Sequence, residues 1–219
     1  MCFSATASFG ASIMLASIGT VAIKKAKTPS LRVLAIIPFV FSLQQFSEGW
    51  VWLSLTKEAF AVWKQPSMYA FLFFAEVTWP ICISFSMMRV EKHHKRKQFL
   101  KLIFYVGIAL SLVLSFSLFY YRVDARVLGS HVMYSIDSPV SFKSITNLFY
   151  LLTAVIPPFL SSQKKDRWIG VILIVSYIVA KIFYADFIIS IWCYFATMIS
   201  LVVLWIILDS PEKFPFANK

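Results

Sequence analysis

Residues 43–50 read Leu-Gln-Gln-Phe-Ser-Glu-Gly-Trp, and this segment is the most informative one in the chain. Two amides and the Glu48 carboxylate stand inside an apolar run from Leu31 to Leu55, which is long enough to cross a bilayer. An ionised side chain in a bilayer costs at least ~2.5 kcal/mol unless another group compensates its charge. The segment therefore predicts a membrane helix whose polar side chains face the interior of a bundle.

The composition of the whole chain agrees with a membrane protein. Of its 219 residues, 59% are hydrophobic and 14% are charged, and the mean hydropathy is +0.76. This is more apolar than a soluble domain of that size. The net charge of +11 comes from short basic clusters between apolar runs, which is typical of membrane topology. We therefore expect the lipid bilayer as a partner and no nucleic acid.

Seven apolar runs approach or exceed the roughly 20 residues that span a hydrocarbon core. We predict one all-α, polytopic transmembrane helix bundle over residues 1–219, with spans near 3–23, 31–55, 67–88, 100–121, 143–161, 168–187 and 188–208. A short Tyr184-Ala185-Asp186 turn and Lys181 are all that divide the last two runs. Six helices is therefore the competing count.

The distribution of basic residues predicts the orientation. One set of connections carries 15 Lys and Arg residues and the opposite set carries 5. The richer side belongs in the cytoplasm, so we expect the amino end outside, the carboxyl end inside, and a bacterial inner-membrane location. The basic inner loops, including His93-His94, are expected to lie against anionic lipid headgroups. The outer loop 122–142 is long enough to act as a lid.

The opening Met1-Cys2-Phe3-Ser4-Ala5-Thr6-Ala7 and the motif Gln44-Gln45-x-x-Glu48-Gly49 resemble an uncharacterised family of bacterial integral membrane proteins. Members of that family begin Met-Cys-(Phe or Trp)-Ser-Ala-Thr-Ala. The resemblance covers the first quarter of the chain and implies a bacterial multispan protein. The resemblance does not indicate a chemical reaction.

Depth estimates place three ionisable side chains in one layer of the membrane. A helix rises about 1.5 Å per residue, which puts Glu48 about 7 Å, Glu76 about 2 Å and Lys181 about 5 Å from the middle of their spans. We expect Glu48 and Lys181 to pair inside the bundle. The alternative is a buried salt bridge that fixes helix register and binds nothing. Glu76 has a further alternative role beside backbone groups freed by the Trp79-Pro80 kink.

Helical spacing adds neighbours to this layer. Gln44, Gln45, Glu48 and Trp52 share one stripe, as do Tyr177, Lys181 and Tyr184. Polar faces on the fifth and seventh spans add Asn147, Tyr150, Ser190 and Cys193. The predicted ligand-binding residues are Gln44, Gln45, Glu48, Trp52, Glu76, Lys181, Tyr184 and Cys193.

The three cysteines, Cys2, Cys82 and Cys193, show no metal-type spacing, so no disulfide framework follows. A metal ion held by Cys2 and Glu48 is possible only if the first residues dip into the bundle. The cofactor is otherwise unknown.

Three classes of function fit these residues. The first is a sensor, receptor or small-solute transporter that binds a small ligand or ion in an outer cavity. The second is an intramembrane hydrolase using a Cys/Glu metal site or a carboxylate pair. The third is a retinal-type chromophore protein on Lys181. The polar layer and the absence of a recognisable catalytic constellation in the sequence favour the first.

Overall fold

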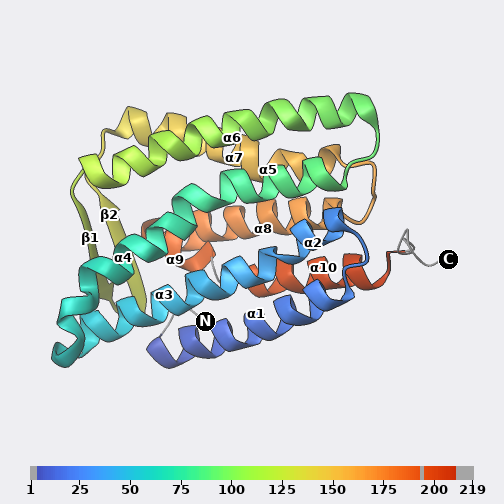
Figure 1. Ribbon diagram of the computed structural model, residues 1–219. Helices are drawn as coiled ribbons and strands as arrows, with labels where there is room; N and C mark the ends of the chain where they lie inside the picture. Colours follow the sequence, from blue (N-terminus) through green and yellow to red (C-terminus); the bar gives the residue numbers. More distant parts are fainter. Residues whose placement is uncertain (1–3, 193–194, 211–219) are drawn as a thin grey trace.

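The computed structural model describes residues 4–192 and 195–210, and that part of the chain is mainly helical (Figure 1). Five helical segments are long and apolar enough to cross a membrane: Ala5–Lys25, Pro29–Thr56, Glu58–Val90, His94–Tyr120 and Val140–Leu160. The shorter helices α8 (Arg167–Phe183), α9 (Ile188–Trp192) and α10 (Ala196–Leu208) follow. The chain has the features of a multi-pass membrane protein, while the count of seven spans stays a prediction.

Two of the long segments are composites that are interrupted near prolines. The second joins α2 (Pro29–Ala35) to α3 (Ile37–Thr56), with a break at Ile36 just before Pro38. The third consists of a 3-10 turn η1 (Glu58–Trp63), α4 (Lys64–Leu72), a π-helix η2 (Phe73–Thr78) and α5 (Trp79–Val90). Proline lacks the N–H that continues helical hydrogen bonding. The predicted span 67–88 is thus part of a longer helical segment.

Helix α1 (Ala5–Lys25) packs along α3 through small residues. The Ser12 and Ser42 hydroxyls each donate to the other's backbone carbonyl, at 2.9 and 2.8 Å. A Cβ on Gly19 would lie 3.0 Å from the backbone nitrogen of Phe39. Small residues on this face therefore allow the two backbones to approach closely.

The outer loop 122–142 contains a β-hairpin that the sequence did not predict. Strand β1 (Val123–Leu128) pairs antiparallel with β2 (His131–Ile136), so the all-α description needs this correction. Gly129 has φ 61, which a two-residue turn between strands requires. The Lys64 ammonium donates to Asp124 at 2.8 Å. This hydrogen bond lowers the pKa of Asp124 and ties the hairpin to α4.

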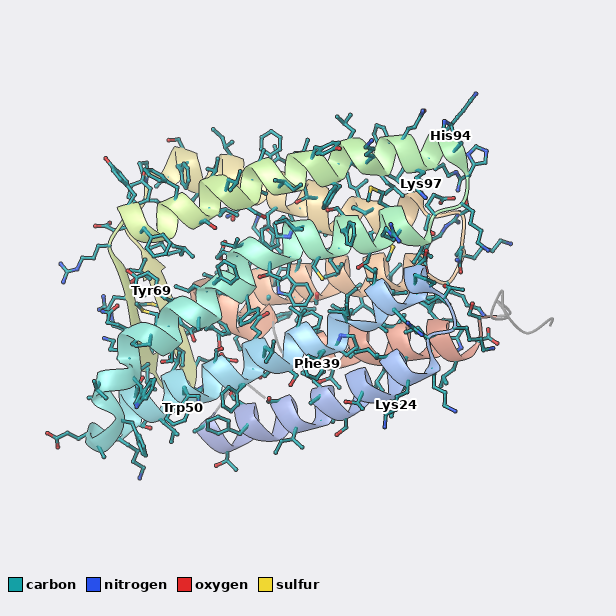
Figure 2. The ribbon with its side chains drawn as sticks, in the orientation of Figure 1. Lys24, Phe39, Trp50, Tyr69, His94 and Lys97 are labelled. Carbon is teal, nitrogen blue, oxygen red and sulfur yellow. The ribbon has the colours of Figure 1, made fainter. Side chains whose placement is uncertain are left out.

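The two ends of the bundle differ in charge. The hairpin lies at one end, and the carboxyl end of the chain lies at the other (Figure 1). Lys24, His94 and Lys97 all lie at that other end (Figure 2). The basic clusters therefore gather opposite the hairpin, as the predicted orientation requires.

At the basic end, the loop after α5 is joined to the loop between α7 (Val140–Leu160) and α8. The Glu91 carboxylate is 2% exposed and accepts from the backbone N–H of His93 and of Ser162, each at 2.6 Å. The Ser162 hydroxyl donates to it at 2.8 Å. Burial alone would raise the pKa of Glu91, but the hydrogen bonds from His93 and Ser162 outweigh it and lower that pKa.

Asp166 lies in the same junction and has a different environment. It is fully buried and accepts a hydrogen bond from the Ser161 hydroxyl. Its other oxygen, Oδ1, has no hydrogen-bond partner in the described part of the chain. Burial raises the pKa of Asp166 to about 6, against the effect of the Ser161 hydrogen bond, and the charge of Glu91 adds to the rise.

Candidate functional site

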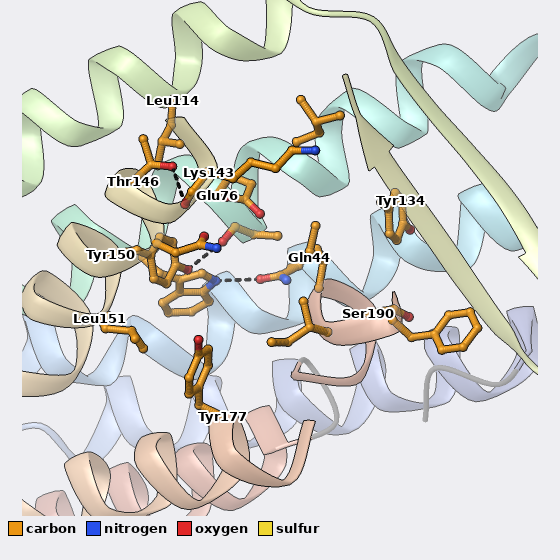
Figure 3. Close-up of a pocket in the computed structure, with 18 of the residues that line it drawn as sticks. Gln44, Glu76, Leu114, Tyr134, Lys143, Thr146, Tyr150, Leu151, Tyr177 and Ser190 are labelled. Atoms are coloured by element: carbon orange, nitrogen blue, oxygen red, sulfur yellow. Dashed lines mark hydrogen bonds between the residues drawn. The ribbon is translucent and has the colours of Figure 1, made fainter. Parts of the chain in front are cut away.

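A cavity of about 410 Å³ lies between the helices at the hairpin end of the bundle. Its walls come from α3, η2, strand β2 and the helices from α5 to α10, where α6 is His94–Tyr120. Glu76, Tyr150 and Tyr177 point into this space (Figure 3). The volume falls within the range of small-molecule sites, about 300–1,000 Å³.

Glu76 reaches the cavity from the π-helix η2, immediately before Trp79 and Pro80. A π-helical turn holds an extra residue compared with an α-helix, and such turns are frequent at functional sites. The turn leaves backbone carbonyls without their usual helical donors. The Tyr150 hydroxyl donates to the carbonyl of Ala75 at 2.7 Å, and the Ser111 hydroxyl donates to the carbonyl of Val77 at 2.7 Å.

The sequence predicts two alternative roles for Glu76, ligand binding or support of the kinked backbone. The Tyr150 and Ser111 hydroxyls favour the first. The Glu76 carboxylate is not needed to serve the kinked backbone, because Tyr150 and Ser111 serve it. Within the described residues, no hydrogen bond or ion pair engages the Glu76 carboxylate. Its side chain is half-buried and lines the cavity. The Glu76 carboxyl group therefore faces a space large enough for a ligand.

Glu48 lies directly behind the cavity wall. It is fully buried and accepts from the hydroxyl of Ser190 at 2.6 Å and from the side-chain amide of Gln45 at 3.2 Å. Ser190 lines the cavity, whereas Glu48 and Gln45 are not among the lining residues. Glu48 thus supports the wall through Ser190.

The amide of Gln44 takes part in the wall itself. Its side-chain oxygen accepts from the indole N–H of Trp79 at 2.8 Å, and Trp79 stacks on Phe41 with ring centroids 3.8 Å apart. Trp52, which the sequence places on the same stripe, is 5% exposed. Its indole nitrogen has no hydrogen-bond partner among the described residues, and it does not line the cavity.

The predicted pairing of Glu48 with Lys181 is wrong. Lys181 is exposed on α8, and its ammonium lies 5.7 Å from the centroid of the Tyr177 ring. Tyr184 is 37% exposed, and its ring stacks on His131 of the hairpin at 5.3 Å. Both residues follow Tyr177 at helical spacing, but the rotation of α8 turns only Tyr177 toward the cavity.

The structure does not describe Cys2 and Cys193, so most of the predicted metal site lies outside the described residues. Cys82 is partly buried and forms no disulfide. Within the described part of the chain, no group of three or more His, Cys, Asp or Glu residues could hold a metal ion. A site using Cys2 and Glu48 stays a prediction.

Several lining residues were not predicted from the sequence. Lys143 and Phe142 enter from the start of α7, and residues 132–136 of β2 cover the cavity on the hairpin side. The spacing of Lys143, Asn147 and Tyr150 would have placed Lys143 on the polar face of α7. The Gly129-Ser130 pair is typical of a two-residue hairpin turn, but the alternation on either side of it is too short to predict two strands.

By the length and composition of its helices, this is a multi-pass membrane protein, with a mainly apolar cavity at one end of the bundle that Glu76 lines. The chain belongs to DUF6629, a family of unknown function, whose model matches residues 1–214. This match extends the resemblance seen in the first quarter of the sequence to nearly the whole chain. No curated protein and no solved structure matches it.

Proposed function

We propose that the protein is a bacterial inner-membrane protein that binds a small organic cation in the cavity at the hairpin end. In the predicted orientation, with seven spans and the amino end outside, that end faces the periplasm. Binding there fits a sensor or receptor, or a small-solute transporter. The observation that carries the proposal is the Glu76 carboxylate, which faces the cavity without a protein partner among the described residues.

Electrostatics favour a cation as the ligand. An ionised carboxylate within a membrane-spanning segment is costly without a counter-charge. The attraction between opposite charges is several times stronger near a protein interior than in bulk water. A bound cation would therefore supply the compensation that the described residues do not give Glu76.

The cavity walls favour a cation with an organic body. Trp79, Tyr150, Tyr177 and Phe41 bring aromatic rings to the lining. Cations bind over the faces of such rings, and Trp and Tyr are the best partners. A bare metal ion would gain little from these apolar walls.

Among the described lining residues, Lys143 is the one cation, and it opposes the binding of another. Its side chain is exposed, and it forms no ion pair in the described residues. Exposed charges are screened more strongly than partly buried ones. The Lys143 ammonium is therefore expected to weaken cation binding slightly, and Lys143→Met is expected to strengthen it.

Binding of a matched ligand set tests the proposal. The purified protein in detergent is titrated with benzylamine, benzyl alcohol and benzoate, which share a ring and differ in charge, while the thermal midpoint is followed. We expect only benzylamine to bind, and Glu76→Gln to weaken it about tenfold or more. Glu58→Gln is the control, because Glu58 is an exposed carboxylate at the same end.

Two results would overturn the proposal. Equal binding of the alcohol and the amine would mean that Glu76 does not select charge. Retained amine binding in Glu76→Gln would mean that the cation sits elsewhere.

The other two classes of function gain no support from the cavity. The carboxylate pair of the hydrolase hypothesis is separated, because Glu76 lines the cavity and Glu48 lies behind Ser190. Lys181, the predicted chromophore lysine, is exposed and does not line the cavity.

A further inference from the structure

A second concavity lies at the basic end of the bundle, opposite the end that holds the proposed cation site. It has a volume of about 360 Å³. Its lining comes from the start of α2, the end of α5, the loop before α6, the first turns of α6 and Gln163. Lys97, one of the lining residues, lies at that end of the molecule (Figure 2). We call this concavity the inner pocket.

The inner pocket holds an excess of positive charge. Three cations line it, Arg89, Lys92 and Lys97, against one carboxylate, Glu91. Glu91 is already occupied by the donors of His93 and Ser162. The side chains of Arg89 and Lys97 make no hydrogen bond or ion pair in the described part of the chain. Their charge is left for an anion that comes from outside the chain.

The side chains in the inner pocket suit a phosphate group. A guanidinium binds phosphate oxygens through two parallel N–H donors, and lysine binds them as a point charge. The hydroxyls of Thr28 and Ser30 lie in the same lining and offer further donors. A phosphodiester carries two anionic oxygens and two ester oxygens around phosphorus, whereas a carboxylate carries two oxygens in all.

The position of the inner pocket suggests where the phosphate comes from. Helix α5 ends at Val90 and α6 begins at His94, so the pocket lies where two long apolar helices leave the membrane. Anionic lipid phosphates lie at that depth and attract basic residues. We propose that the inner pocket binds the phosphate of an anionic lipid headgroup. This inference does not rest on the cation site at the opposite end.

The experiment compares two double variants with equal loss of charge. Arg89→Gln with Lys97→Gln removes two cations from the inner pocket. Lys24→Gln with Lys25→Gln removes two exposed cations from the same end, outside the pocket. Each purified protein is titrated with short-chain phosphatidylglycerol, phosphatidylcholine or inorganic phosphate, and the thermal midpoint and retained lipid, by native mass spectrometry, are followed.

We expect the parent protein to prefer phosphatidylglycerol over phosphatidylcholine. The pocket variant should bind phosphatidylglycerol about tenfold or more weakly, while the control variant keeps the parent affinity. Arg89→Lys with Lys97→Arg keeps the charge and should restore most of the binding, which separates loss of the site from loss of folding.

The titration with inorganic phosphate distinguishes a lipid headgroup from free phosphate as the ligand. Loss of binding confined to the lipid supports the headgroup. Loss of inorganic phosphate binding without a lipid preference overturns the lipid assignment. An equal loss in both double variants would mean diffuse surface charge, and unchanged binding in the pocket variant would mean another site. Either result would overturn the inner pocket as a phosphate site.

Discussion

The helical segment Glu58–Val90 carries Glu76 in its interior and is followed at once by Glu91, and these two carboxylates have different surroundings. Glu76 faces a cavity and has no partner among the described residues. Glu91 accepts three hydrogen bonds within a buried junction. The exposed fraction of the side chain is smaller for Glu91 than for Glu76, so a small exposed fraction alone does not mark a binding residue. The difference in protein partners separates the carboxylate available to a ligand from the one that holds two loops together.

The largest effect is expected from Glu91→Gln. The amide keeps one acceptor oxygen and presents an NH₂ group to backbone N–H donors, so the variant should lose about 3 kcal/mol of stability. Thermal unfolding in detergent measures the loss. Glu58→Gln, at an exposed position, should change stability by less than about 0.5 kcal/mol.

The contrast between Glu91 and Glu76 is tested most directly when the thermal unfolding of Glu76→Gln is measured as well. It breaks no hydrogen bond within the described residues and removes a charge from a membrane segment, so its thermal midpoint should equal or exceed that of the parent. A loss as large as that of Glu91→Gln would mean that Glu76 holds the fold as well, and the comparison would fail.

An intermediate effect is expected from Gly107→Ala on α6. A Cβ at Gly107 would lie 2.5 Å from the carbonyl oxygen of Pro80, so α6 and α5 must move apart. Overpacking of this kind costs about 2 kcal/mol, and the shift should also weaken amine binding, because Pro80 follows the turn that carries Glu76. Gly10→Ala is the control, since nothing lies within 4 Å of its Cβ position. Equal midpoints for the two variants would contradict the close approach.

The effect expected from Asp166→Asn depends on pH. The folded pKa of about 6 lies above the ordinary value of 3.8, so the folded state binds the proton more tightly than the unfolded state. Stability is then greatest below pH 3.8 and falls as the pH rises toward about 6. Asp166→Asn should remove this fall, raising the thermal midpoint at pH 8 and leaving it unchanged near pH 4. A midpoint that drops at pH 8 would show that the charged form is stabilising.

The sequence predicts the helical membrane class well, because long apolar runs broken by basic clusters are rare in soluble domains. It also predicts that Glu76, Gln44, Tyr150 and Tyr177 approach one space, since helical spacing fixes which residues share a face. Depth along a helix was a weaker guide. Glu48 and Lys181 have similar depths, but depth does not specify rotation, and Lys181 turned out to be exposed.

Three features required coordinates. The hairpin pairs residues whose alternation is short and interrupted by charges, so it gives little periodic signal. Whether Glu76 has a partner depends on side chains of other helices, and within the described residues none of them donates to its carboxylate. The inner pocket joins α2, α5 and α6 with Gln163, a combination that no local pattern indicates.

The π-helix at Phe73–Thr78 has a consequence for how the cavity arises. One residue corresponds to about 100° of rotation about an α-helix axis. The extra residue in this turn therefore rotates the direction in which all later side chains of the segment point. Trp79 and Ile83 reach the same cavity as Glu76 because of that rotation. The juxtaposition of carboxylate and indole is therefore a matter of chain length as well as of residue type, and a deletion within this turn would separate them without altering either side chain.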